Sequence, residues 1–425
     1  MQNHLVLITL LAGGCILSVA CGGSPSTGSQ SDGGPGMMMT TTGSSSSGGS
    51  SDDSGITAPP GGEGGTSSSS SSGAGDSGST TPTSDAAGPG TDGGFPPGWL
   101  YTEGNKIMVS TGSTATRWMG RGVNMDDIFM CGNNNNLQQS NPDMTQQTEI
   151  DGLMSGWKPS FVRYSLSMNS FKAVSWLSNP AQYQTPVMNA IHHLGSYPGL
   201  YVLLTLRSDV SMMVGDSGNK DPTWIPSDST TTPDKTKFPM GTDPVYTALV
   251  DAFAQDNYII FALSNEPGGS VKTDATISSA MNHAVGVIRA EEDKLGVPHH
   301  LVSVQGNGYT SQLKMYTATP SPITHDNVVY ELHYYPGLAG ETPSNYQYAD
   351  TLPMIIGEYG DFTSSVPQSG FYTDMEAKMI PNLAWDFDPF SGCAPDLLNV
   401  THSATMLQPT SWGMSVQTYL LAHAK

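Results

Sequence analysis

The amino-acid sequence predicts a (β/α)8 barrel, an α/β fold, over residues 98–425. Three observations carry this prediction. Eight short β-rich runs can be read from Trp118 onward, helical patterns lie between them, and most of the runs are continuously apolar. Continuous apolar runs are typical of strands that are buried on both faces of a parallel sheet. An open doubly wound sheet is the alternative arrangement of the same units.

The predicted strands are short, and strand-favouring residues dominate them. In chain order they are residues 117–124, 160–166, 200–207, 258–266, 301–307, 327–335, 353–360 and 382–388. Residues 98–113 precede these strands and contain a turn at Gly104 and Asn105 between two short strands. We expect this segment to form a β-hairpin that covers the floor of the barrel.

The clearest helical pattern covers residues 275–296. Asp274 is expected to cap its first turn, and Gly296 is expected to end it. Its apolar stripe consists of Ile277, Met281, Val285, Ile288 and Leu295. The other helical patterns are residues 148–157, 185–197, 244–256, 370–380 and 411–425.

Residues 1–21 are typical of an export signal, because an apolar segment is followed by "LSVAC", which ends at Cys21. "SVAC" before "GGS" resembles a bacterial lipoprotein cleavage site, where cleavage before Cys21 leaves that residue as the lipidated N-terminus. A plain secretory signal is the alternative. The apolar stretch is too short, and too interrupted by glycines, for a transmembrane helix. We therefore expect an exported protein, either a lipoprotein of the bacterial outer membrane or cell surface or a secreted protein.

Residues 22–97 are almost wholly Ser, Gly, Thr and Pro. Such a segment cannot bury enough apolar surface to offset chain entropy, so we expect a flexible tether without a fold. The net charge is −21, and seven acidic residues lie in the tether, which leaves about −14 for residues 98–425. This charge argues against nucleic acid as a partner, whereas a neutral polymer remains compatible with it. We expect a monomer.

Polar and aromatic residues stand at the ends of several predicted strands, where the active site of a (β/α)8 barrel lies. One such residue would more often be structural, but residues on six strands together predict a site. They are Asn124 on the first strand, Arg163 on the second, Asn265 and Glu266 on the fourth, His333 and Tyr335 on the sixth, Glu358 on the seventh and Trp385 on the eighth.

The two carboxylates predict a chemistry. Glu266 and Glu358 are expected on opposite sides of the barrel mouth, as hydrolysis of a glycosidic bond requires. One carboxylic acid protonates the departing oxygen, and the other carboxylate attacks the anomeric carbon. A separation of roughly 5 to 5.5 Å means a retaining mechanism, and a gap of about 6.5 to 9.5 Å means inversion.

The neighbouring residues indicate which carboxylate does what. Arg163 and the Tyr335 hydroxyl are expected to keep Glu358 ionised as the nucleophile. Glu266 follows an aliphatic run, so we expect it to be the drier carboxyl group, with a raised pKa, and to serve as general acid and then base.

Other strand-end residues are expected to hold the substrate. Asn265 is expected to donate to the sugar 2-hydroxyl, and Trp385 offers a flat apolar face to a sugar ring. His333 and Tyr335 are two residues apart on one strand, so both are expected to face inward.

The folded part resembles family 5 glycoside hydrolases, the cellulase and mannanase family of retaining (β/α)8 enzymes, over about residues 100–390. The resemblance implies that Glu266 is the acid/base and Glu358 the nucleophile. The motifs that carry it are "RGVN" at 121–124, "VR" with Arg163, "NEP" with Glu266, "HYY" with His333 and Tyr335, "GEYG" with Glu358, and Trp385.

Arg207 departs from the family pattern. Family members usually end the third strand in Asp-Leu-His, whereas this chain reads "LTLRSD" with Arg207 in place of the imidazole. Arg207 is expected either to hydrogen-bond a sugar hydroxyl or to pair with an acid such as Asp209. Trp224, in the long segment after the third strand, is a candidate wall of a sugar subsite or part of a surface loop.

Cys131 and Cys393 follow the first and eighth strands, which become neighbours when a barrel closes. An exported protein permits a disulfide, so we predict that these two residues form one.

The sequence as a whole predicts an endo-acting β-glycanase on β-1,4-glucan, with β-1,4-mannan as the second candidate substrate. A polysaccharide-binding surface lipoprotein without catalysis is the alternative from another class of protein. The sequence contains no HExxH, CxxC or phosphate-binding loop, so we expect neither a metal nor a cofactor.

Overall fold

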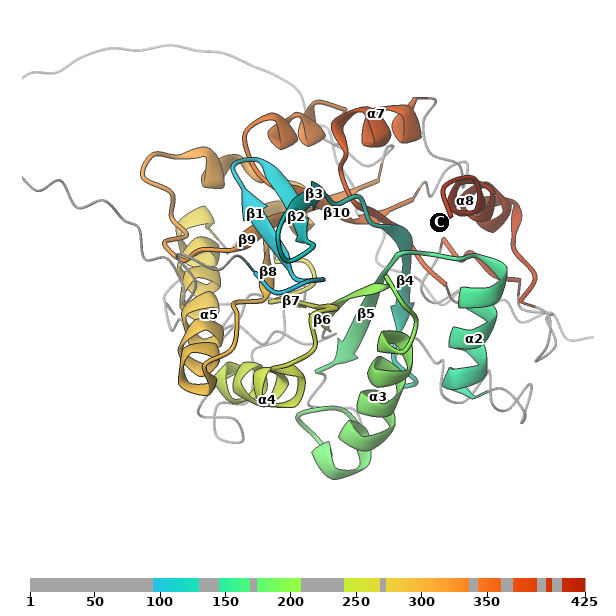
Figure 1. Ribbon diagram of the computed structural model, residues 1–425, viewed down its shortest axis with the longest axis horizontal. Coiled ribbons are helices and arrows are strands. Elements are labelled where there is room, and N and C mark those ends of the chain that lie inside the picture. The colour runs from blue at the N-terminus through green and yellow to red at the C-terminus, as the bar shows by residue number, and fades with distance from the viewer. Residues whose placement is uncertain are drawn as a thin grey trace, which may run out of the picture. The chain divides into compact units, whose positions relative to one another are not determined.

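The computed structural model describes residues 95–129, 145–168, 174–207, 241–267, 273–335, 343–360, 370–387, 395–399 and 407–424. Eight parallel strands form a closed barrel in the order β10-β11-β4-β5-β6-β7-β8-β9 (Figure 1). The first and last barrel strands pair with each other, which confirms the (β/α)8 barrel and excludes the open sheet. The strands are β4 (Arg121–Asp126), β5 (Phe161–Ser167), β6 (Tyr201–Arg207), β7 (Ile259–Ala262), β8 (Leu301–Gln305), β9 (Val328–Tyr334), β10 (Met354–Tyr359) and β11 (Asn382–Ala384).

Helices surround the barrel (Figure 1), and each predicted helical pattern corresponds to one of them. The predicted pattern from Thr185 began too late, because its helix begins at Pro180 and continues through Pro186. The helices are α2 (Gln146–Gly156), α3 (Pro180–Gly195), α4 (Asp243–Phe253), α5 (Asp274–Leu295), α7 (Phe371–Lys378) and α8 (Ser411–Ala422). Shorter helical turns are α6 (Asn307–Thr310), η1 (Lys314–Thr317) and η2 (Pro343–Asp350).

The ends of α5 correct two details of the prediction. Thr273, not Asp274, caps the helix, and its side-chain oxygen accepts a hydrogen bond from the Thr276 amide at 3.2 Å. Thr and Asp are both good N-cap residues, so the sequence pattern fits a helix start at either of the two neighbouring positions. Leu295 is 41% exposed and lies off the buried stripe. Gly296 ends the helix as predicted, with a φ of 66° that favours glycine.

A small antiparallel sheet covers the floor of the barrel, the end where the strands begin. It contains the two predicted strands β1 (Leu100–Glu103) and β2 (Lys106–Ser110), and a third strand, β3 (Ala115–Arg117), that was not predicted. Leu100 and Trp118 pack with the inward-facing side chains of the barrel floor. This packing gives the barrel a closed apolar base.

The side chains inside the barrel change character from floor to mouth. Strand residues alternate between the inside and the helix-facing side with a period of two. At the floor the inward side chains are apolar and form one cluster, which includes Phe161, Leu203, Ile260, Leu301, Val329, Ile355 and Leu383. Two residues further along their strands, Arg163, Thr205, Ser303 and Glu331 are fully buried and polar. The polar layer therefore begins inside the barrel, below the mouth.

A β-bulge at Gly357 re-aims the end of β10. Ile356 pairs with Leu332, but Glu358, two residues later, pairs with the next residue, His333, so Gly357 is an extra residue. If Gly357 paired in regular register instead, alternation would turn Glu358 toward the helices. The bulge admits only glycine here, because a Cβ on Gly357 would lie 1.9 Å from Glu331 Oε1. The bulge therefore places the Glu358 carboxylate inside the barrel.

Several predicted features lie outside the described residues. These are the export signal and tether, the lipidation of Cys21, the subsite residue Trp224 and the disulfide between Cys131 and Cys393. They stay predictions. Within the part of the chain that the structure describes, no helix combines the length and apolar character needed to cross a bilayer.

Candidate active site

Arg163, from β5, is the centre of the polar layer and is fully buried. Its Nη1 donates to Glu358 Oε1 at 2.8 Å and to Asn124 Oδ1 at 2.9 Å. Its Nη2 donates to Asn265 Oδ1 at 2.8 Å, and its Nε forms an ion pair with Glu331 Oε1 at 2.9 Å. One planar guanidinium thus fixes side chains from four different parts of the barrel, which a point charge such as lysine could not do.

Glu358 is 4% exposed and is held by donors on both carboxylate oxygens. The Tyr335 hydroxyl donates to its Oε2 at 2.6 Å, opposite the bond from Arg163. Burial alone would raise the pKa of this carboxyl group. The positive charges of His333, Arg163 and Arg207 act against burial, as does the tyrosine hydroxyl, and they hold the pKa of Glu358 below its ordinary value. Glu358 is therefore an ionised carboxylate, in agreement with the sequence prediction.

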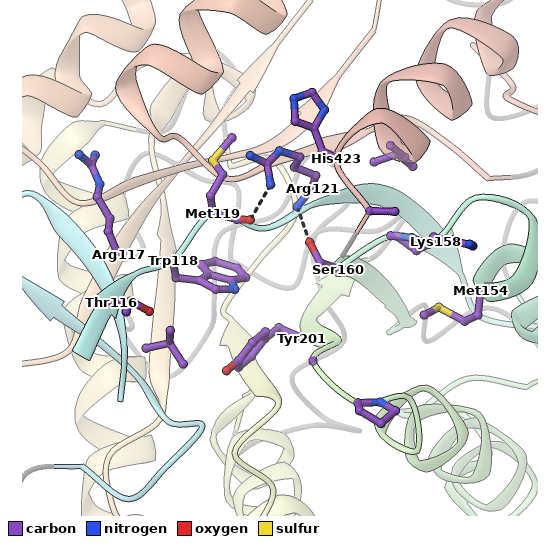
Figure 2. Close-up of a pocket in the computed structure, with 16 residues that line it drawn as sticks. Thr116, Arg117, Trp118, Met119, Arg121, Met154, Lys158, Ser160, Tyr201 and His423 are labelled. Atoms are coloured by element: carbon purple, nitrogen blue, oxygen red, sulfur yellow. Dashed lines mark hydrogen bonds between the residues drawn. The ribbon is translucent and has the colours of Figure 1, made fainter. Parts of the chain in front are cut away.

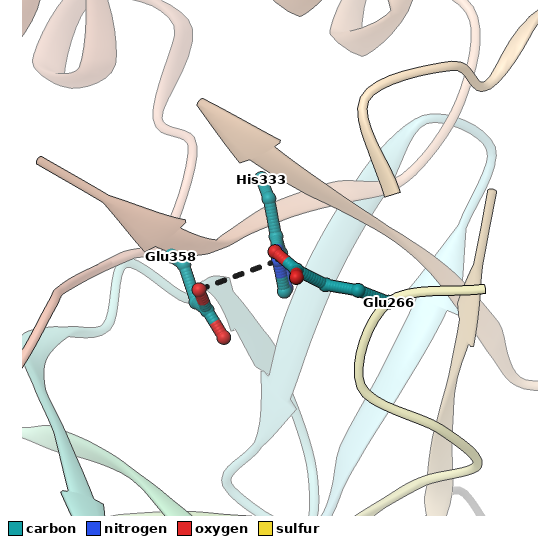
Figure 3. Close-up of side chains that lie close together, drawn as sticks. All are labelled: Glu266, His333 and Glu358. Carbon is teal, nitrogen blue, oxygen red and sulfur yellow. Dashed lines mark hydrogen bonds and ion pairs between the residues drawn. The ribbon is translucent and has the colours of Figure 1, made fainter. Parts of the chain in front are cut away.

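Glu266 lies just beyond β7 and faces Glu358, with His333 between them (Figure 3). His333 Nδ1 lies 2.7 Å from Glu266 Oε1 and 3.5 Å from Glu358 Oε2. The prediction that Glu266 is the drier carboxyl group was wrong, since its side chain is 22% exposed against 5% for Glu358. Glu266 stands past the last strand residue, Ala262, whereas Glu358 lies within its strand.

Glu331 is a buried carboxylate that the sequence analysis missed. Its Oε1 lies 3.2 Å from His333 Nε2, and its Oε2 accepts from Ser303 Oγ at 2.8 Å and from Gln305 Nε2 at 2.6 Å. Burial would raise its pKa, but the charge of Arg163 and the bonds from these donors lower it to about 2. A signal for it existed, because Glu331, His333 and Tyr335 are spaced by two along one strand and so share its inner face.

His333 is positively charged in this setting. Burial lowers the pKa of an imidazole, but the negative charge of Glu358 and hydrogen bonds to Glu266 and Glu331 raise the pKa of His333 to about 9. Both ring nitrogens therefore carry protons, and each donates to a carboxylate. His333 and Tyr335 both face inward, as predicted.

The two asparagines of the site have different roles: Asn124 joins barrel strands, and Asn265 carries an amide group with a fixed orientation. Asn124 Nδ2 donates to the backbone oxygens of Gly357, at 3.0 Å, and Ala384, at 3.2 Å, so it joins the first, seventh and eighth barrel strands. Asn265 Oδ1 faces Arg163, which fixes the orientation of its amide group. Its backbone oxygen accepts from Thr310 Oγ1 at 3.0 Å, which anchors the segment that carries Glu266.

Arg207, the last residue of β6, reaches across the mouth to Trp385. Its guanidinium carbon lies 4.4 Å from the centroid of the Trp385 ring, and its Nη1 lies 3.5 Å from Asp126 Oδ1. Arg207 thus pairs with an acid, as one of the two predicted alternatives had it, although the acid is Asp126; Asp209, the example named, lies outside the described residues. Trp385, predicted as a sugar platform, is only 3% exposed.

The site also contains three potential metal ligands. Ligand atoms of Glu266, His333 and Glu358 lie within 4.8 Å of one another. However, a protonated imidazole has no lone pair to offer a metal, and each carboxylate already accepts hydrogen bonds from cationic donors. This arrangement suits proton transfer better than metal binding.

A pocket of about 490 Å³ lies at the opposite end of the barrel (Figure 2). It is bordered by the small sheet, the starts of β4 and β6, and the end of α8. Its lining includes Arg117, Trp118, Arg121, Lys158, Tyr201 and His423. Active sites of this fold lie where the strands end, so this pocket on the floor is separate from the candidate active site.

Buried acids adjoin the end of β4, close to the site. Burial raises the pKa of Glu149, on α2, to about 8, and the negative charge of Asp126 adds to the shift. Burial also raises the pKa of Asp127 to about 7, although the Tyr183 hydroxyl donates to it and acts in the opposite direction. These groups make the stability of the fold depend on pH.

Glu149→Gln is expected to stabilise the protein at alkaline pH. Between about pH 4.5 and pH 8 the folded state keeps the Glu149 proton, whereas the unfolded state loses it, so the free energy of unfolding falls by roughly a few kcal/mol as pH rises. Glutamine removes this titration. Thermal denaturation should therefore give a higher Tm than the wild type at pH 9 and a similar Tm near pH 4. The exposed Glu103→Gln is the control, and an equal response of both variants would contradict the prediction.

Fold and site together define a (β/α)8 barrel with paired carboxylates at the carboxyl ends of its strands, the architecture of barrel glycosidases. The family model described as cellulase (glycosyl hydrolase family 5) matches residues 129–391. The chain belongs to this family of glycoside hydrolases. No curated protein matched the sequence.

Solved structures agree with the fold. The catalytic domain of the Thermobifida fusca endoglucanase Cel5A, in complex with cellotetraose, is 16% identical, with a TM-score of 0.53 over 76% of this chain and 97% of that chain. A β-glucanase from Saccharophagus degradans with cellotetraose is 17% identical, with a TM-score of 0.54 over 77% and 94%. A β-mannanase from Streptomyces thermolilacinus is 17% identical, with a TM-score of 0.52 over 77% and 98%. At these identities the likeness concerns the fold alone.

Proposed function

We propose that the protein is a retaining endo-β-glycanase that hydrolyses β-1,4-glucan. The observation that carries this proposal is the position of Glu266 and Glu358, which face each other across the mouth with carboxylate oxygens within 4.8 Å. Retaining enzymes hold their two carboxyl groups roughly 5 to 5.5 Å apart, whereas inversion requires room for a water molecule between carboxyl groups about 6.5 to 9.5 Å apart. The short gap favours retention.

In the proposed first step, Glu358 attacks the anomeric carbon while Glu266 gives its proton to the departing oxygen. The glycosidic C–O bond breaks, and a covalent ester forms between the sugar and Glu358. Glu266 gains a negative charge as it gives up the proton. The His333 imidazolium, already 2.7 Å away, stabilises that charge as it develops.

In the second step, Glu266 takes a proton from a water molecule, which attacks the anomeric carbon and releases Glu358 as a carboxylate. Arg163 and Tyr335 favour this release because both donate to the ionised carboxylate. The same two donors keep Glu358 ready for the next substrate.

Two of the similar structures, an endoglucanase and a β-glucanase, hold cellotetraose, which supports a β-1,4-glucan. The similar β-mannanase makes β-1,4-mannan the second candidate. A polysaccharide-binding protein without catalysis fits less well, because both carboxylates are present and each is held by a cationic donor.

A reducing-sugar assay of the full chain tests the proposal. The panel is cellulose, mixed-linkage β-glucan, β-mannan, xylan and β-1,3-glucan, and we expect the highest kcat/KM on a glucan that contains β-1,4 bonds. Proton NMR of the first product should show the β-anomer. A first product in the α-configuration would contradict retention, and no hydrolysis of any glycan in the panel would contradict the enzyme assignment.

A further inference from the structure

The side chain of Arg207 spans the mouth of the barrel. Arg207 ends β6 and Trp385 follows β11, and β4 and β5 lie between these two strands in the barrel order. Its guanidinium carbon lies 4.4 Å from the indole centroid, so the two side chains meet at the barrel mouth although two strands separate their own strands. The guanidinium therefore lies over the mouth, on the face of an aromatic ring.

The indole of Trp385 is covered in this state. The residue is 3% exposed and packs against Tyr335, which its hydrogen bond to Glu358 fixes in place. The Arg207 side chain is 21% exposed and is long enough to move toward solvent. A ring that stacked on Trp385 would need the place that the guanidinium takes.

We infer that Arg207 is a specificity-determining residue, whose guanidinium occupies the sugar-stacking face of Trp385 until a bound sugar displaces it. The inference rests on the proposed function of the site. The Arg207 guanidinium and a sugar ring compete for the same face of Trp385, because cations and the apolar faces of sugar rings both bind indole.

The consequence is a preference for long chains. Displacement of Arg207 from Trp385 and Asp126 lowers the affinity of this subsite for every sugar. A glycan that also fills neighbouring subsites can offset the loss with the binding free energy of its other rings. A short oligosaccharide cannot, so the side chain selects for polymeric substrate.

Isothermal titration calorimetry with cellotetraose and mannotetraose tests the inference. The ligands are added to full-length Glu358→Gln protein, which cannot turn them over, and to the double variant Glu358→Gln/Arg207→Ala. We expect the Kd of the better ligand to fall by about 2- to 30-fold, the range that a cation–π contact accounts for. An unchanged or higher Kd would overturn the inference, since the latter outcome means that Arg207 binds the sugar directly.

Three further variants control for a general loss of structure or charge. Removal of Arg207 leaves the buried Asp126 without that cation, so the pair Glu358→Gln/Asp126→Asn and Glu358→Gln/Asp126→Asn/Arg207→Ala repeats the comparison. The same fall in Kd is expected in this background, and its absence counts against the inference. Lys158→Ala, in the Glu358→Gln background, removes an exposed cation at the barrel floor and should leave the Kd unchanged.

The inference and the proposed function can fail separately. If the wild type hydrolyses a β-glycan but Arg207→Ala does not tighten binding in the Glu358→Gln background, only the role of Arg207 is wrong. If the wild type hydrolyses no glycan and the Glu358→Gln protein binds neither tetraose, both the function and the inference are wrong.

Discussion

Replacement of Glu358 by glutamine is expected to lower kcat on β-glucan by about four to six orders of magnitude, as loss of a catalytic nucleophile does elsewhere. Glutamine keeps the shape of the side chain and an oxygen that can accept from Arg163, but it cannot form the covalent ester. The measurement is kcat from reducing-sugar release, with circular dichroism and Tm to establish that the variant is folded.

Chemical trapping provides the control for this result. A 2-deoxy-2-fluoro glucosyl fluoride should label the wild type once, and mass spectrometry of a proteolytic digest should place the label on the peptide that contains Glu358. The Glu358→Gln variant should remain unlabelled. Wild-type activity in the variant, or a label on another carboxylate, would remove the nucleophile assignment.

Replacement of Glu266 by alanine is expected to cost about 10² to 10⁴-fold in kcat/KM on polysaccharide, because the departing sugar oxygen is a poor leaving group without a proton. A dinitrophenyl glycoside needs no such proton, so its first step should be nearly unaffected. Water activation in the second step is lost, and a glycosyl-enzyme should accumulate. Steady-state and burst kinetics on both substrates measure the difference.

Azide separates the roles of the two carboxylates. In Glu266→Ala, azide should attack the glycosyl-enzyme and restore turnover with a β-glycosyl azide as product. In Glu358→Ala, the matched control, azide takes the place of the nucleophile and should yield the α-glycosyl azide. The same anomer from both variants, or an equal loss on all substrates in Glu266→Ala, would count against the assigned roles.

The barrel and the outline of the site could be predicted from the sequence because both depend on local patterns. Continuous apolar runs indicate buried strands. A polar residue at the end of such a run is expected at the mouth of the barrel, where the strands end. Glu266, Glu358 and Arg163 were found in this way, and the structure brings them together as expected.

The missed features depend on where strands far apart in sequence come to lie. Glu331 is a supporting residue whose partners outside its own strand lie on β5 and β8, so these contacts were visible only after the barrel closed. The contact of Arg207 with Trp385 depends on the direction of a long side chain over the mouth. The relative exposure of Glu266 and Glu358 depends on how far each lies from its strand, which an apolar run does not reveal.

The bulge at Gly357 makes the reaction depend on how many residues of β10 pair with the neighbouring strand before Glu358. Side chains alternate between the two sides of a strand, so one more or one fewer paired residue moves every later side chain to the opposite side. If Gly357 paired in regular register instead of bulging, the Tyr359 phenol would turn toward the substrate and the Glu358 carboxylate toward the apolar layer beneath the helices. The direction of the catalytic carboxylate is therefore set by a neighbour that has no side chain and takes no part in the chemistry.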